Sequence, residues 1–297
     1  MSGAAAVPFA DLALARRLER AEATSSAGFV EARARLFPSS RACWIEVAGA
    51  YAMFDGVRSP ITQTFGLGMF EAPTSGHLDR LEAFFHERGA ETHHEVSPLA
   101  DPALVPLLNE RGYQPFEFTS VMYRPIGEQA GLKARTTSTT DSEVAQAFRP
   151  AVRLVGDDDR DHELYARVAA EGWRDLGYAD FMLEIGRVSA NTEGLRLFVA
   201  ESDGTAIAAG AIHLRDGVAH LAGASTIPEG RRRGAQLALL DERLQFAAVN
   251  GCDIALMGAS PGSGSQRNAE RHGFRIAYTR VKWKRPSRTY SVRSVRL

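Results

Sequence analysis

The sequence predicts an α/β protein of two similar halves, each built from a mixed, mainly antiparallel sheet flanked by helices. Three observations support this prediction: short apolar runs alternate with helical patterns, Asp-Gly turns separate consecutive apolar runs, and one motif occurs once in each half. A chain of 297 residues is long enough for two domains with separate cores, and 44% hydrophobic with 24% charged residues is ordinary globular composition.

The second half carries the clearest elements. A helical pair is expected at about 141–189, and three strands follow at 195–201, 205–214 and 217–226. Asp203 and Asp216 each precede a glycine between these runs, and Asp-Gly between apolar runs is the strongest short signal for a hairpin. The three runs therefore predict an antiparallel unit.

Residues 226–240 predict a strand end, a glycine loop and the start of an amphipathic helix. Leu237, Leu240 and Leu244 recur at helical spacing. Amide groups at a helix N-terminus have no intrahelical acceptors and lie at the positive end of the dipole, so a pyrophosphate gains hydrogen bonds and charge compensation there. Gly234 allows the backbone to approach a phosphate closely. This segment is expected to bind an anion.

The remaining elements of the second half follow in order. Residues 252–257 predict a buried strand, 260–265 form a Pro/Gly/Ser loop, a helix ends before Gly273, and 276–283 predict a last strand.

The glycine loop resembles motif A of the GNAT superfamily of acyl-CoA-dependent N-acyltransferases, which reads Arg/Gln-x-x-Gly-x-Gly/Ala after a strand that ends near a proline. Pro228, Arg231 and Gly234 match it, whereas Gln236 stands where Gly or Ala is usual. The register from Ser265 to Phe274 also resembles a helix of the ribosomal-protein N-terminal acetyltransferases. The resemblance covers about residues 133–286.

The resemblance implies an N-acyltransferase that uses acetyl-CoA or another acyl-CoA. In the family the main chain of the fourth strand, here 222–226, binds the pantetheine arm and offers an N–H to the carbonyl oxygen. The implied cofactor-binding residues are Ala224, Ser225, Thr226, Arg231, Arg232, Arg233, Gly234, Ala235, Gln236 and Asn268.

The resemblance leaves the acid and the base less well defined. Ala269 stands at the position of the family's usual tyrosine acid, so Ser265 is the alternative proton donor; its other reading is an N-cap or first-turn serine. His213 and His220 lie on adjacent predicted strands and could titrate near neutral pH, although a histidine on a strand is often structural. Ser265 and His220 are the predicted catalytic residues.

Two groups between the predicted helices concern the acceptor. The acidic run 157–161 with Glu163 could attract a cationic amine, or it is a solvated loop. Trp173, Tyr178 and Phe181 could line the acceptor pocket, or they form the buried face of a helix.

The first half repeats the order of the second. Asn109 to Tyr113, with twelve residues to Pro125, parallels Glu270 to Phe274 with the same spacing to Pro286. A helix at 76–90, a strand at 92–97 and a helix at 102–111 are expected before it, but 70–76 lacks an Arg-x-x-Gly motif. The first half is therefore interpreted as a degenerate GNAT-like domain, an arrangement similar to two-domain acyltransferases such as mycothiol synthase.

These features predict four segments. They are a degenerate domain at 1–127, a linker at 128–134, a catalytic domain at 135–286 and a basic tail at 287–297.

Composition limits the partners. A net charge of −1 argues against a nucleic-acid binder, and no zinc-ligand spacing is present. Cys43 and Cys252 are expected to be small buried hydrophobes. The N-terminus lacks the positive region of a signal peptide, and no stretch has transmembrane length, so we predict a cytoplasmic protein without membrane partners. The sequence leaves a homodimer open.

Three functions remain open. The first is transfer of an acetyl group from acetyl-CoA to a primary amine of a small metabolite by direct attack. The second has a protein N-terminus or lysine as the acceptor, as the Ser265 register suggests. The third is a non-catalytic acyl-CoA sensor or scaffold, suggested by Gln236 and the missing tyrosine. A pocket roofed by the N-terminal half would favour a small acceptor, and an open groove would favour a protein.

Overall fold

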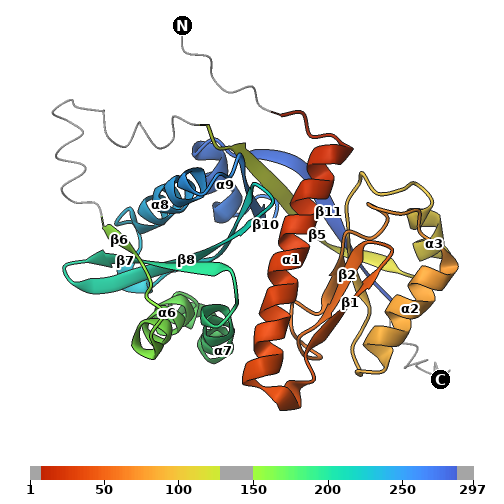
Figure 1. Cartoon of the computed structure of the whole chain (residues 1–297), viewed down its shortest axis with the longest axis horizontal. Coiled ribbons are helices and arrows are strands. Elements are labelled where there is room, and N and C mark those ends of the chain that lie inside the picture. The colour runs from red at the N-terminus through yellow and green to blue at the C-terminus, as the bar shows by residue number, and fades with distance from the viewer. Residues whose placement is uncertain (1–7, 128–149, 286–297) are drawn as a thin grey trace, which may run out of the picture.

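The computed structural model describes residues 8–127 and 150–285 (Figure 1). The predicted linker 128–134 and basic tail 287–297, and the part of the predicted helical pair before 150, lie outside the described residues. The described residues form one mixed sheet with helices on both faces. The predicted α/β fold class is confirmed, with the difference that the two predicted sheets are joined into one.

The sheet has eleven strands in the order β1-β2-β3-β4-β11-β5-β10-β9-β8-β7-β6. The first half supplies β1 (Cys43–Val47), β2 (Ala50–Phe54), β3 (Gln63–Phe65), β4 (His93–Val96) and β5 (Gln114–Pro125). The second half supplies β6 (Ala151–Leu154), β7 (Leu195–Ser202), β8 (Thr205–Arg215), β9 (Val218–Thr226), β10 (Ile254–Ala259) and β11 (Arg275–Lys284). Two neighbouring pairs, β3 with β4 and β9 with β10, are parallel, and the other pairs are antiparallel.

The last strands of the two halves change places at the centre of the sheet. β5 lies between β10 and β11 of the second half, and β11 lies between β5 and β4 of the first. The predicted boundary at residue 127 comes directly after β5, so the hydrogen-bonded ladder continues without a break across it. Each half completes the sheet of the other.

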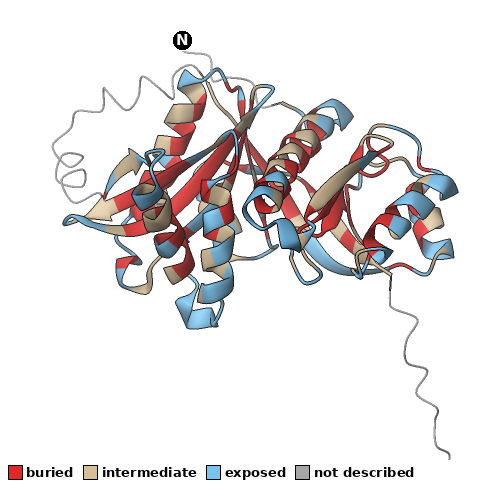
Figure 2. Ribbon diagram, turned by 60° about the horizontal axis from the view of Figure 1, so that its bottom comes forward, coloured by how far each residue is buried: buried red, intermediate tan, exposed pale blue. Residues whose placement is uncertain are grey.

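The helices are α1 (Leu12–Leu36), α2 (Ser75–His86), α3 (Leu104–Glu110), α6 (Asp159–Glu171), α7 (Ala179–Ala190), α8 (Ala235–Val249) and α9 (Gly264–Arg271). Alternate residues of the strands pack on opposite faces. α1, α6 and α7 cover one face, and α2, α3, α8 and α9 cover the other. Buried residues concentrate along the sheet and on the inner sides of these helices (Figure 2).

The 25-residue helix α1 stands between the two halves (Figure 1). Its N-terminus is capped by Asp11, whose carboxylate accepts from the Leu14 amide at 2.9 Å. Leu18 packs against strands of the central sheet, and Phe29 packs against Val188 of α7. α1 thereby belongs to the N-terminal half in sequence and covers part of the C-terminal half in space.

Most predicted elements are confirmed within a few residues. The two Asp-Gly turns have positive φ at both residues, including Asp203 (53°) and Asp216 (48°), as type I′ hairpin turns require. Both cysteines are free thiols, with Cys252 buried and Cys43 half-buried. The sequence analysis did not predict α1, β1 to β3 or β6. Strand β6 lies within 141–189, where only a helical pair was expected, because residues 151–154 pair with β7 at the edge of the sheet.

Candidate active site

The glycine loop leads from β9 into α8 as predicted. Gly234 is the N-cap of α8 with φ of 79°, and no side chain caps the helix. A Cβ at Gly234 would meet only Pro150, at 3.9 Å, so the space beside this residue is open. Residues 231–234 are all exposed. The first-turn amides of α8 therefore lie next to an accessible surface, where an anion could accept from them.

Two of the three loop arginines hold the loop in place. Arg231 donates to Asp175 at 2.8 Å, and Arg233 donates to Asp203 at 2.9 Å. Within the described residues Arg232 makes no ion pair, and its backbone has a positive φ of 62°. Arg232 is thus the arginine whose charge is available to a ligand of the loop.

Gln236, which departs from the family motif, has a local role. Its side-chain amide donates to the hydroxyl of Thr226 at 2.7 Å. This bond links the first turn of α8 to the end of β9, so the substitution stabilises the loop without placing a side chain over Gly234.

The equivalent helix of the first half, α2, begins differently from α8. Thr74 caps α2 by accepting from the His77 amide at 3.2 Å, and residues 66–69 are buried. A Cβ at Gly68 would lie 3.2 Å from Leu104. A side chain thus caps the helix of the first half, whereas no side chain caps α8 in the second.

β9 and β10 diverge beside the loop. Three residue pairs join them, and the last of these is His220 with Leu256. On its other side β10 pairs with β5 along its whole length, from Ile254 to Ala259. Among the described strands, none pairs with the β10 side of β9 after His220. The exposed residues of this stretch, Gly223 and Ala224, can therefore offer main-chain groups to a ligand on this side.

A β-bulge lies within this open stretch. Ala209 pairs with Ser225 and Ala211 with Ala222, so Gly223 and Ala224 together oppose the single residue Gly210. Gly223 has φ of 58°, typical of a bulge that begins with a left-handed glycine, and both bulge residues are exposed. A bulge turns main-chain amides away from the ladder, which suits a donor to a carbonyl oxygen.

Two large side chains fix the bulge from opposite faces. Tyr165 of α6 is the nearest group to Gly223, where a Cβ would lie 3.2 Å from its hydroxyl. On the other face the buried guanidinium of Arg243 donates to the carbonyls of Ala211 (3.1 Å) and Ala222 (3.4 Å). Burial lowers the pKa of Arg243 to about 10, so it keeps its positive charge at neutral pH behind the bulge.

The side chains of the other predicted cofactor-binding residues are mostly buried or engaged in structural contacts. The Ser225 hydroxyl donates to the carbonyl of Ala169 at 2.9 Å and is buried, so its side chain anchors α6. Ala235 is buried beneath the loop. Asn268 lies half-buried in α9. Main-chain contact remains possible at Ala224 and Ser225, whereas their side chains contribute little.

The predicted catalytic residues lie on opposite faces of the sheet. Ser265 is exposed in the first turn of α9, and Ser263 rather than Ser265 caps that helix, accepting from Gln266 at 3.2 Å. His220 lies on the face covered by α1, directly across from His213. Burial lowers the pKa of both histidines, that of His213 to about 4, so both are neutral at pH 7.

The acidic run is used structurally. Asp158 caps α6, and Asp161 pairs with Arg153 at 2.8 Å and accepts from the Gly156 amide. Glu163 bridges Arg167 and Arg187. These arginines hold the pKa of both Asp161 and Glu163 at about 2 through hydrogen bonds. Residues 157–160 are exposed, so this part of the run is solvated, whereas Asp161 and Glu163 are held by arginines and are not free to bind a cationic amine.

The three aromatic residues of this region are exposed. Tyr178 is 57% exposed, Phe181 40% and Trp173 36%, so they are not the buried face of a helix. They follow Gly172, which packs directly on Ser225 at the end of β9. Trp173, directly after Gly172, therefore lies near the end of β9.

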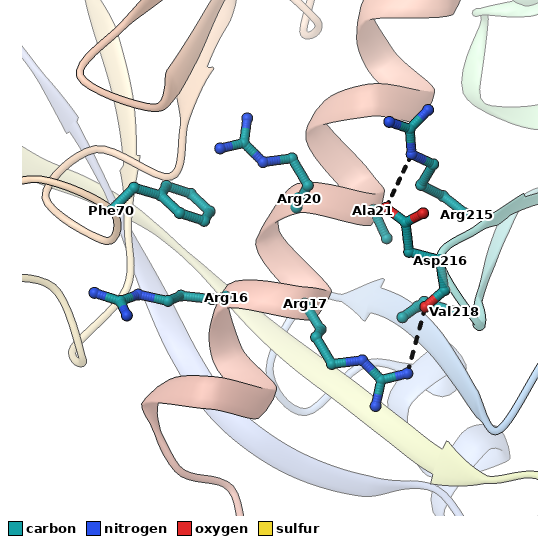
Figure 3. A pocket seen from close by; sticks show the side chains of 8 residues that line it. All are labelled: Arg16, Arg17, Arg20, Ala21, Phe70, Arg215, Asp216 and Val218. Atoms are coloured by element: carbon teal, nitrogen blue, oxygen red, sulfur yellow. Dashed lines mark hydrogen bonds and ion pairs between the residues drawn. The ribbon is translucent and has the colours of Figure 1, made fainter.

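A separate cavity of about 210 Å³ lies at the opposite end of β9 (Figure 3). It is lined by Arg16, Arg17, Arg20, Ala21, Phe70, Arg215, Asp216 and Val218. Arg16 and Arg20 point to the Phe70 side of α1, whereas Arg17 and Arg215 lie on the other side. Arg17 is already paired with Asp253 and Arg20 lies over Phe70, so the guanidinium groups do not converge on a common ligand.

The residues present fit an acyl-CoA. The open N-terminus of α8 with Arg232 suits a pyrophosphate, the unpaired edge of β9 suits the amides of a pantetheine arm, and the bulge at Gly223 suits a thioester carbonyl.

The sequence matches the acetyltransferase (GNAT) family over residues 158–274, which include β9, the glycine loop and α8. No curated protein sequence matches the chain significantly.

Solved structures share the fold across most of the chain. A GCN5-related N-acetyltransferase from Kribbella flavida is 18% identical with a TM-score of 0.59, and the match covers 88% of this chain and 95% of that protein. A tandem GNAT protein from the clavulanic acid biosynthesis pathway is 12% identical with a TM-score of 0.55, covering 79% and 77%. A conserved protein of unknown function from Staphylococcus epidermidis is 12% identical with a TM-score of 0.53, covering 81% and 92%.

The family match and the geometry agree on the same residues. The open helix N-terminus, the diverging strands and the bulge all lie within the matched segment. The C-terminal half of the chain therefore carries an acetyltransferase domain of the GNAT family, over residues 158–274, and with it the fold of an acyltransferase.

Proposed function

We propose that this protein transfers an acetyl group from acetyl-CoA to a primary amine of a small metabolite by direct attack of the amine on the thioester. The observation that carries the proposal is the open stretch of β9, where the unpaired edge, the bulge at Gly223 and the N-terminus of α8, which no side chain caps, follow one another along residues 221–235. The bulge amides would donate to the carbonyl oxygen as negative charge develops on it.

The position of α1 supports a small acceptor. α1 packs over β5, β9, β10 and β11, on the face that carries His220. α1 contacts β9 at Val218 and so bounds the open stretch of β9 at its N-terminal end. An extended protein segment would need an open groove on this face of the sheet, so the presence of α1 favours a compact amine.

The two faces suit the two proton transfers of the reaction. An amine that attacks from the α1 side needs a proton acceptor on that side, where His220 lies. The departing thiolate needs a proton, and Ser265, exposed at the start of α9 on the opposite face, remains the candidate donor.

The test is an amine screen. Purified protein is mixed with acetyl-CoA and a panel of primary amines, and release of free coenzyme A thiol is followed together with the mass of the acetylated product. Amine-dependent thiol release with a matching product is expected. Binding of acetyl-CoA with no turnover of any amine would favour the sensor function, and turnover of peptides but not small amines would favour a protein acceptor.

A further inference from the structure

Arg232 of the glycine loop has an exposed side chain that is not held by its surroundings. Within the described part of the chain its guanidinium makes no hydrogen bond and no ion pair. The arginines on either side differ from it in this respect. Arg231 donates to Asp175 at 2.8 Å, and Arg233 donates to Asp203 at 2.9 Å. Of the three consecutive arginines, the middle one therefore keeps its donors free for a ligand.

The backbone at this position does not favour an arginine. Arg232 has φ of 62°, in the left-handed region that glycine adopts freely and that a residue with a Cβ adopts at a cost. Its side chain is exposed, so it fills no space in the core. Since neither conformation nor packing accounts for the arginine, its charge is the property that remains.

Coenzyme A carries a pyrophosphate and a separate phosphate monoester at the ribose 3′ position. The pyrophosphate does not need Arg232, because the first-turn amides of α8 are free donors at the positive end of the helix dipole. A phosphate monoester carries about −1.5 to −2 charge at pH 7. A group with this charge is bound best by a cation, and the planar guanidinium offers it two parallel donors.

We propose, resting on the proposed function, that Arg232 binds the 3′-phosphate of the acyl donor while the amides of α8 bind the pyrophosphate. Arg232 precedes the N-cap Gly234 by two residues, so its side chain starts beside the helix N-terminus and is exposed to solvent there. The protein is thereby selective for donors built on complete coenzyme A over donors that lack this phosphate.

A second exposed arginine, Arg267, is the competing candidate for the same phosphate. It belongs to α9, which packs in the same core cluster as α8. Because β9 and β10 are parallel and each is followed by one of these helices, α8 and α9 begin at the same end of the sheet. Arg232 is favoured because it lies in the glycine loop itself, and Arg267→Gln belongs in the test.

The test measures binding of the donor alone and needs no acceptor. Purified protein is titrated calorimetrically with acetyl-CoA and with acetyl-3′-dephospho-CoA at one fixed salt concentration. The wild type should bind acetyl-CoA about 10- to 100-fold more tightly, the range expected for hydrogen bonds between charged groups. In Arg232→Gly the Kd for acetyl-CoA should rise by this factor, whereas the Kd for the dephospho donor should stay near the wild-type value.

The variants are chosen so that the backbone is preserved. Glycine adopts the φ of Arg232 without strain, so Arg232→Gly should fold. Arg41→Gly is the matched control, because Arg41 is an exposed arginine with φ of 56° directly before the β1 edge of the sheet. It should bind both donors as the wild type does. Arg232→Lys should recover part of the preference, since lysine keeps the charge and loses the paired donors.

Each outcome has its own meaning. Equal weakening of both donors in Arg232→Gly would place the contact of Arg232 at the pyrophosphate and overturn the inference. An unchanged preference in Arg232→Gly would also overturn it, and a preference lost in Arg267→Gln would then assign the 3′-phosphate to α9. If the wild type binds both donors equally well, the inference is overturned and the proposed function stands. If the wild type binds neither donor, the proposed function fails as well.

Discussion

Replacing Glu19 by Gln tests whether Glu19 is protonated in the buried charge cluster beneath α1, where Arg280 lies against Glu19, Glu22 and Glu95. The Glu19 side chain is 1% exposed and accepts from the Tyr278 hydroxyl at 2.9 Å, a bond that the amide oxygen of Gln can also accept. Burial raises the pKa of Glu19 from 4.5 to about 7 in the folded protein. The folded state therefore holds a proton that the unfolded state releases.

The sign and size follow from this shift. A raised folded-state pKa stabilises the protein fully below pH 4.5, and that stabilisation is lost as pH rises through 7. At about 1.36 kcal/mol per pKa unit, the wild type should lose about 3 kcal/mol of unfolding free energy across this window. Gln cannot ionise, so Glu19→Gln should lack this loss.

The assay is urea denaturation of both proteins at pH 5 and pH 8. The stability of Glu19→Gln relative to wild type should rise by about 2 to 3 kcal/mol between these two pH values. Glu46→Gln, half-exposed in its side chain, should show no such change. If the stability of Glu19→Gln relative to wild type is the same at both pH values, the pKa of Glu19 is not raised and the reasoning is refuted.

Two further predictions concern the loop and the sheet. Acetyl-CoA at about one hundred times Kd should stabilise the wild type by about 2.7 kcal/mol, which a thermal-denaturation assay would detect as an increase in Tm of several degrees. The Gly234→Glu variant should not show this increase, because the new carboxylate occupies the open end of α8. If the variant keeps the increase, the ligand binds elsewhere. Because β5 and β11 each complete the sheet of the other half, the fragments 1–127 and 150–297 should each fail to fold alone and should form the native sheet when co-expressed. Circular dichroism would report folding, and co-purification would report association. Two independently folded fragments would contradict this prediction.

The sequence predicted the parts of the site that depend on local rules. Gly234 and the helix after it follow from glycine conformation and hydrophobic spacing, and the hairpins follow from the Asp-Gly turns at Asp203 and Asp216. The bulge was less accessible. Gly223 inside an apolar strand is a hint of it, but the register that places two residues opposite Gly210 depends on the partner strand.

The residues contributed by α1 could not be located from sequence. Glu22 lies 258 residues from Arg280, and no local pattern connects them. The helix itself had a readable signal, since Asp11 stands before an Ala-rich stretch that carries its charged residues at helical spacing. Even so, only the tertiary fold shows that α1 crosses to the other half and that Ser265 and His220 lie on opposite faces.

The central strand exchange sets an order of events during synthesis. β4 pairs with β11 through Val96 and Val281, which are about 185 residues apart, and at about 5 to 20 residues per second the ribosome needs roughly 10 to 40 s to make that stretch. Until then the β4 edge of the nascent first half has no partner, and β5 waits for β10. The sheet can close only after β11 has been made and has left the ribosome, rather than when the first half is complete, so holding chaperones have a defined interval in which to act.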